Sequence, residues 1–274
     1  MKSSGATVLV VVVLAVIAGL ATWHYRDELF PPPESATGPA TEPSTIVESA
    51  TPAEASDDTG PRHPMPGPTP MTSTSGELVP LPALDDSDAY FLLDVATVFG
   101  AAIESLFTRE AVIDKLVTSV DNLPRANLSE KIRPVGRLGD AFAADAGDDE
   151  TLVLGLSSYL RYDALVAYLY YADLDAVYDT YRRFYPLFQE SYERLGYPDA
   201  HFNDRLVEVI DHLVATPQPA EPIILVRPHV LYEFADPDLQ ALSSGQKLML
   251  RMGPDNAATT QRILIKFRSR IAAN

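Results

Sequence analysis

Two histidines and three carboxylates follow one another at helical spacing near residue 200. His201, Asp204, Glu208, Asp211 and His212 are separated by steps of three, four, three and one. On an α-helix these steps place all five on one face about 100° wide. Imidazole and carboxylate groups can bind divalent metal ions. However, the spacing matches no recognised ligand motif, and every surface helix has a polar face, so we predict no metal site.

A second group of polar residues interrupts an apolar segment. Arg161, Tyr162 and Asp163 are consecutive, and an Arg–Asp pair in apolar surroundings is either buried structure or part of a binding site. We combine them with polar residues from later segments as a candidate polar cluster. The candidate polar cluster comprises Arg161, Tyr162, Asp163, Asp204, Arg205, Asp211, His212 and Lys247.

Familiar catalytic and cofactor-binding motifs are not matched. The chain has no Cys, which excludes thiol chemistry. Ser244-Gly245-Gln246-Lys247 has part of a phosphate loop but lacks its earlier Gly and its final Ser or Thr. No Ser is set in a nucleophile elbow beside His and Asp. We therefore assign no catalytic residue, metal or cofactor.

Tyrosines are concentrated in one part of the chain. Ten of the 13 lie between Tyr159 and Tyr197. Such residues could stack against sugar rings, although sugar sites more often use Trp. Tyr at helical spacing usually packs its ring in a core and directs its hydroxyl to the rim. The pattern thus favours a helical core over a sugar site.

The periodicity of apolar residues predicts a mainly α, multi-helix globular domain over residues 81–274. One short β-hairpin is expected near residues 223–234, which are β-branched and contain Pro228. The expected helices span residues 86–107, 109–120, 156–195 with a kink or restart at Pro186, 201–215, 236–252 and 255 to near the C-terminus.

The N-terminus carries a long uncharged segment. After a short N-terminal segment, residues 1–6, we predict a transmembrane helix over residues 7–25, with Trp23 and Tyr25 at the membrane interface. A cleaved signal peptide ending near Gly19-Leu20-Ala21 is the alternative, but the apolar run is long for one. We favour a signal anchor in contact with the lipid bilayer.

Residues 26–80 are rich in Pro, Thr and Ser and contain few large apolar residues. They are expected to form a disordered linker. Lys2 and the α-amino group precede the apolar run, and Arg26, followed at once by Asp27 and Glu28, comes after it. The positive-inside bias therefore favours a periplasmic domain on the inner (cytoplasmic) membrane. The net charge of −17 makes nucleic acid an improbable partner.

Several blocks of the domain resemble a known family. They are Ser119-Val120-Asp121-Asn122-Leu123-Pro124-Arg125, Tyr159-Leu160-Arg161-Tyr162-Asp163, Tyr185-Pro186-Leu187-Phe188-Gln189-Glu190, Leu195-Gly196-Tyr197-Pro198, Phe202-Asn203-Asp204-Arg205-Leu206, Val230-Leu231-Tyr232-Glu233-Phe234-Ala235-Asp236-Pro237, Leu242-Ser243-Ser244-Gly245-Gln246-Lys247 and Leu250-Arg251-Met252-Gly253-Pro254. Together they resemble the bacterial domain-of-unknown-function family 3014. The resemblance implies a membrane span and a Pro-rich linker before the domain, but no site residue.

Two functions are compatible with these features. The first is a tethered, non-catalytic binding or scaffolding module for an envelope protein or cell-wall component. The alternative is a carboxylate-dependent cell-wall or small-molecule hydrolase. The hydrolase requires two carboxylates that converge in a cleft, with Asp163, Asp204, Glu208 and Asp211 as the candidates.

Overall fold

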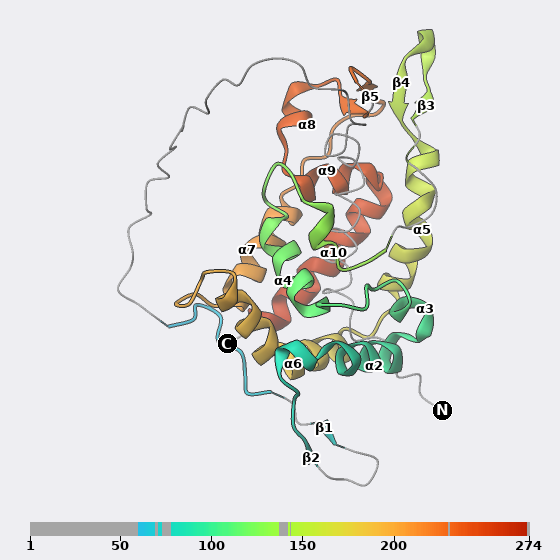
Figure 1. Ribbon diagram of the computed structural model, residues 1–274. Coiled ribbons are helices and arrows are strands. Elements are labelled where there is room, and N and C mark those ends of the chain that lie inside the picture. The colour runs from blue at the N-terminus through green and yellow to red at the C-terminus, as the bar shows by residue number, and fades with distance from the viewer. Residues whose placement is uncertain are drawn as a thin grey trace, which may run out of the picture.

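Helices dominate the computed structural model, which describes residues 60–68, 71–72, 78–136, 142, 144–229 and 231–272 (Figure 1). The predicted mainly α class is confirmed. The α-helices are α2 (Asp88–Phe99), α3 (Ala101–Glu104), α4 (Val112–Asn122), α5 (Leu156–Tyr170), α6 (Leu174–Arg194), α7 (Phe202–Val214), α8 (Pro237–Ala241), α9 (Ser244–Arg251) and α10 (Pro254–Ile271). Short 3-10 helices occupy Leu84–Asp86, Glu130–Ile132 and Asp148–Glu150.

A small antiparallel sheet lies at one end of the domain (Figure 1). Its strands, in spatial order, are β3 (Asp145–Ala146), β4 (Leu152–Leu154), β5 (Ile223–Val226) and β6 (Glu233–Phe234). β5 and β6 pair as the predicted hairpin. β3 and β4 were not predicted, because two or three residues are too few to show a strand period. A separate pair, β1 (Met71–Thr72) and β2 (Leu78–Val79), precedes the helices.

Three expected helices are divided differently from the prediction. The helix expected over residues 236–252 is two helices, α8 and α9, because Ser243 caps the start of α9 with a capping box. The helix expected over residues 86–107 breaks at Gly100, whose φ of 80° lies outside the helical region. The helix expected over 156–195 does not restart at Pro186, which lies inside α6. It breaks earlier, where the Asp173 side chain accepts hydrogen bonds from the N–H groups of Asp175 and Ala176 and caps α6.

The last helix, α10, forms the centre of the packing. It lies between α5 and α7 and also contacts α6 and α9 (Figure 1). Phe267 of α10 is fully buried and meets the Tyr181 ring of α6 at 5.8 Å between centroids. One turn further along α6, Phe184 packs edge-on against Phe91 of α2, at 5.2 Å between ring centroids. Aromatic contacts thus join the first and last helices of the domain through α6.

Part of the predicted linker lies against the folded domain. Residues 60–68, which we call the docked segment, pass the start of α7 near the C-terminal end of α10 (Figure 1). The predicted transmembrane helix over residues 7–25, with Trp23 and Tyr25, lies outside the described residues. Within the described ranges, no helix has the length and apolar character needed to cross a bilayer.

Candidate functional site

A cleft of about 640 Å³ lies where α5 and α10 begin. We call it the α5–α10 cleft. Its walls come from β4, the first two turns of α5, Glu221 and Pro222 before β5, and the start of α10. The lining residues are Val153, Leu154, Gly155, Leu156, Tyr159, Asp163, Glu221, Pro222, Met252, Gly253, Pro254, Asp255 and Asn256. A volume of this size is sufficient for a small ligand or a few side chains of a partner.

Close contact between Gly253 and Tyr159 shapes the cleft. Gly253 caps α10 with φ 82° and ψ 163°, a conformation that residues with a Cβ rarely adopt. A Cβ at this position would lie 2.5 Å from Cγ of Tyr159, so the glycine also makes space for the ring. The N-terminus of α10 can therefore approach α5 closely enough for both helices to line the same cleft.

Hydrogen bonds hold the polar side chains of the cleft in place. The Tyr159 hydroxyl lies 2.7 Å from Oε1 of Glu221 and 3.0 Å from the Leu154 carbonyl, so its proton faces two acceptors. Burial, followed by the hydrogen bond to Glu221, raises the pKa of Tyr159 and keeps it neutral. Across the cleft, Nδ2 of Asn256 donates to Oδ1 of Asp163 at 2.7 Å.

The charge of the cleft is negative and its rim is apolar. Three lining residues, Asp163, Glu221 and Asp255, are acidic, and none of the lining residues is basic. At the rim, Leu156 is 64% exposed and Leu160, one turn later, is 56% exposed. Such a surface is complementary to a positively charged group carried on an apolar body.

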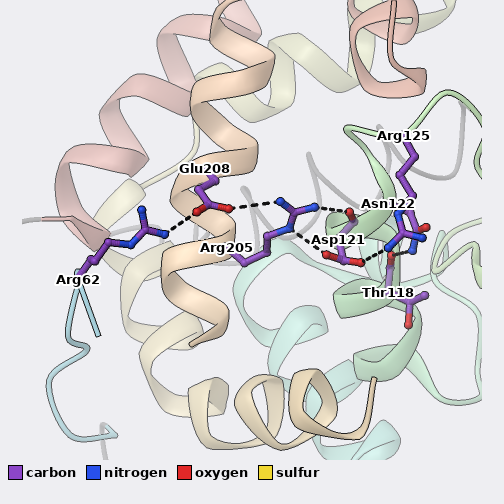
Figure 2. Close-up of polar contacts among 7 residues, drawn as sticks. All are labelled: Arg62, Thr118, Asp121, Asn122, Arg125, Arg205 and Glu208. Carbon is purple, nitrogen blue, oxygen red and sulfur yellow. Dashed lines mark hydrogen bonds and ion pairs between the residues drawn. The ribbon is translucent and has the colours of Figure 1, made fainter. Parts of the chain in front are cut away.

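A second polar arrangement joins α4 to α7 (Figure 2). Asp121, at the end of α4, is 3% exposed and accepts hydrogen bonds from Nε of Arg205 at 2.9 Å and Nη2 of Arg125 at 3.0 Å. Arg205 also donates to the Asp121 carbonyl at 2.8 Å and pairs with Glu208 at 3.3 Å. Figure 2 shows Arg205 between Asp121 and Glu208, with Arg62 of the docked segment beyond Glu208.

The candidate polar cluster is not brought together in one place. Asp163 lines the α5–α10 cleft, and its neighbours Arg161 and Tyr162 do not. Tyr162 is buried in the core, and the Arg161 guanidinium lies 6.0 Å from the centroid of the Tyr162 ring. Asp204 accepts hydrogen bonds from the docked segment. Arg205, the next residue of α7, donates a hydrogen bond to Asp121. The residues of this prediction therefore belong to several distinct environments.

The remaining three members lie further along the chain. Asp211 forms a two-point pair with Arg268 on α10, at 2.5 and 2.8 Å. His212 faces α9, where Nε2 lies 2.8 Å from Oγ of Ser243, the N-cap. Lys247 of α9 is 4% exposed. Its pKa is lowered by burial and then by the nearby Arg251, and Glu233 opposes this in part. None of these three lines the α5–α10 cleft.

The carboxylates proposed for a hydrolase have separate roles. Asp163 contacts Asn256, Asp204 binds the backbone of the docked segment, Glu208 pairs with arginines and Asp211 pairs with Arg268. Only Asp163 of these four lines the α5–α10 cleft. Among the described residues, moreover, no three His, Asp or Glu side chains are grouped as metal ligands would be.

His212 provides a test of the contact between α7 and α9. Burial, and then the nearby Arg205, lower its pKa. The folded protein therefore binds a proton at His212 less readily than the unfolded chain does, in which the imidazole has a pKa of about 6.5. The contribution of neutral His212 to the free energy of unfolding is complete above the pKa of the unfolded chain. It declines as the pH falls through the lower pKa of the folded protein. We expect the stability advantage of the wild type over His212→Gln to shrink between pH 7.5 and 5.0 in urea unfolding; equal differences at both pH values would contradict the assignment.

The tyrosines divide between the core and the surface. Tyr162, Tyr181 and Tyr192 are at most 5% exposed, which confirms the expected core role for these three. Tyr170 and Tyr171 are exposed at the end of α5, with ring centroids 5.3 Å apart. They lie at the opposite end of α5 from Leu156, which lines the α5–α10 cleft.

Comparison with known protein families places this domain. A model of DUF3014, described as a protein of unknown function, matches residues 112–268. The chain belongs to this family. Comparisons with curated proteins and with solved structures give no match. The DUF3014 match includes every residue that lines the α5–α10 cleft, as well as Asp121 and Arg205, whereas the docked segment lies before it.

The sequence blocks of the DUF3014 region meet in pairs. Gly245 of one block donates its N–H to the Leu123 carbonyl of another at 3.0 Å, joining the ends of α4 and α9. Likewise, Gly253 packs against Tyr159 at the cleft. Sequence reasoning missed the roles of Asp121, Glu221 and Asn256. Asp121 lies in one of these blocks, and this was a sequence signal that could have drawn attention to it. Glu221 and Asn256 lie outside the blocks, and no sequence signal pointed to them.

Proposed function

We propose that this DUF3014 protein is a single-pass, membrane-anchored binding module in the bacterial envelope. Residues 7–25 cross the cytoplasmic membrane, the linker follows on the periplasmic side, and the helical domain binds an envelope protein or cell-wall component without chemical change. The α5–α10 cleft is the single observation that carries this proposal, because it combines a preformed volume, three carboxylates and an exposed apolar rim.

The position of the cleft relative to the linker supports this arrangement. Residues at the start of α10 line the cleft. At the other end of this helix, the Asn203 amide donates hydrogen bonds both to the Ile271 carbonyl and to the His63 carbonyl of the docked segment. The 18 residues of α10 rise about 27 Å. The docked segment therefore lies at the opposite end of α10 from the cleft and does not line it.

The chemistry of the cleft indicates what the partner presents. Opposite charges across an interface guide association, and apolar rim residues provide area for burial. Asp255 and Glu221 contribute negative charge, and Leu156 and Leu160 contribute exposed apolar surface. The partner surface that fits is a Lys, Arg or other amine beside apolar groups.

Site-specific photo-cross-linking in cells of the source bacterium tests this function. The full chain carries p-benzoylphenylalanine at Leu156 in the cleft or, as a control, at Leu93 on α2; these side chains are 64% and 67% exposed. We expect a discrete adduct from position 156, and any adduct from position 93 should be several-fold weaker. Asp255→Lys should weaken the adduct from position 156. Equal yields at both positions, or no adduct, would overturn the cleft as the binding site.

The same samples test the anchor. The full-length protein is expected in the membrane fraction, and the chain without residues 1–25 is expected in the soluble fraction. Full-length protein in the soluble fraction would contradict the anchor without bearing on the cleft.

A further inference from the structure

The docked segment, residues 60–68, has the features of a bound peptide. It contains four prolines and forms no helix or strand. His63 and Met65 are partly covered, and the other seven residues are exposed. Met65 packs on the main hydrophobic core. The segment therefore lies on the surface of the domain and inserts one apolar side chain.

Its backbone is recognised by side chains at the start of α7. The carboxylate of Asp204 accepts hydrogen bonds from the N–H groups of Arg62 and His63, at 2.9 and 2.7 Å. The Asn203 amide donates to the His63 carbonyl at 2.7 Å. These contacts use both backbone polar groups of one residue, as domains that bind extended peptides do.

Two further contacts hold the segment at either end. Nη2 of Arg62 pairs with Oε1 of Glu208 at 2.5 Å, one turn beyond Asp204 on α7. Nε of Arg182, on α6, donates to the Gly67 carbonyl at 2.7 Å. Arg182, Asn203, Asp204 and Glu208 form what we call the α7 docking site. They contact a basic side chain and the backbone of the segment, and Met65, three residues after Arg62, packs on the core.

Burial is unequal on the two sides of this contact. Asn203 is 0% exposed and Asp204 is 8% exposed, whereas no residue of the docked segment is buried. Buried polar groups need partners, and the docked segment supplies them with two N–H groups to Asp204 and one carbonyl to Asn203. Its own side chains are mostly exposed, so little apolar burial beyond Met65 offsets the entropy lost when the segment is ordered.

The match to DUF3014 separates the two sides as well. Arg182, Asn203, Asp204 and Glu208 lie within the matched residues 112–268, and the segment that covers them lies outside. The docking site therefore lies within the family match, whereas its present occupant lies before it, as the core helix α2 also does.

We propose that the α7 docking site is a receptor for an extended, Pro-containing peptide of a partner protein, with Arg three residues before Met or a similar apolar residue. Residues 60–68 occupy it in cis as a displaceable ligand. Prolines suit the role because they restrict the free peptide and reduce the entropy lost on binding. This inference requires neither the membrane anchor nor the α5–α10 cleft.

Peptide binding to the full chain, solubilised in detergent, tests the proposal. The probe is a synthetic, fluorescein-labelled peptide with the sequence of residues 58–70, followed by fluorescence anisotropy. Arg62→Ala combined with Met65→Ser in the protein removes the two side-chain anchors of the cis ligand. We expect the peptide to bind this variant at least ten times more tightly than the wild type, because the cis competitor is weakened.

A charge exchange keeps the test specific and independent of folding defects. Arg62 and Glu208 have side chains 63% and 45% exposed, so Arg62→Ala should preserve the fold. Glu208 also pairs with Arg205, so far-ultraviolet circular dichroism and urea unfolding must first show that Arg62→Ala with Glu208→Lys is folded. Adding Glu208→Lys to Arg62→Ala should weaken the peptide at least tenfold, and a peptide with Glu in place of Arg62 should recover binding. Equal, weak binding to all variants, with no recovery by the exchanged peptide, would show that residues 60–68 are a permanent part of the fold and overturn the proposal.

Discussion

Asp121→Ala is expected to lower the free energy of unfolding by about 3 kcal/mol, the scale measured when one partner of a buried ion pair is removed. The Asp121 side chain is 5% exposed and accepts from both Arg205 and Arg125. Without it, the Arg205 guanidinium, whose side chain is 25% exposed, retains the Asp121 carbonyl and a longer contact with Glu208. The measurement is urea unfolding of the full chain in detergent, followed by far-ultraviolet circular dichroism.

The pair between Asp211 and Arg268 provides the matched control. It also joins α7 to another helix with two hydrogen bonds, but its side chains are 50% and 37% exposed. Water screens such a pair, so Asp211→Ala should change stability by less than about 1 kcal/mol. Equal losses from the two substitutions would mean that burial does not distinguish them, and Asp121 would then have no special structural role.

The helices that the sequence predicts well are those whose pattern is local. The apolar face of residues 201–215 corresponds closely to α7, Phe202–Val214, because this helix buries one side along its whole length. The pattern over residues 156–195 continues without interruption across the break before α6. There, the signal that mattered was Asp173, a capping residue followed by Leu174 and Asp175, and not Pro186.

The candidate site was harder to predict, because its contacts join residues that are distant in the chain. The sequence singles out Asp163 for its place beside Arg161, but its partner Asn256 lies 93 positions away. Asp204 was chosen for helical spacing, whereas its partners lie 141 and 142 positions earlier, in the predicted linker. Spacing along one helix shows which side chains share a face; it does not show which distant segment lies against that face.

The docked segment also changes how the linker is understood. A Pro-rich composition with few apolar residues indicates a chain that cannot form its own core. Such a chain can still lie on a core that another segment provides, as Met65 does. Composition therefore predicts the absence of independent folding, and the acceptors on α7 decide where the chain is held.

The largest effect at the cleft is expected from Gly253→Ala. A backbone with positive φ and extended ψ costs a residue with a Cβ about 1–3 kcal/mol, and an overpacked contact adds about 1–3 kcal/mol. Gly253 incurs both, because its φ is 82° and its ψ is 163°, and the added Cβ would lie 2.5 Å from the Tyr159 ring. Urea unfolding should therefore show a loss of roughly 2–6 kcal/mol.

Gly100→Ala separates these two contributions. Gly100 has φ 80° and ψ 161°, nearly the values of Gly253, and also precedes a helix, but an added Cβ there meets nothing within 4 Å. The backbone effect should thus be similar, and the excess loss in Gly253→Ala measures the contact with Tyr159. In a background of Tyr159→Ala that excess should disappear, because the ring is absent. If it persists, Gly253 does not make space for the tyrosine, and the close approach of α10 to α5 at the cleft has another cause.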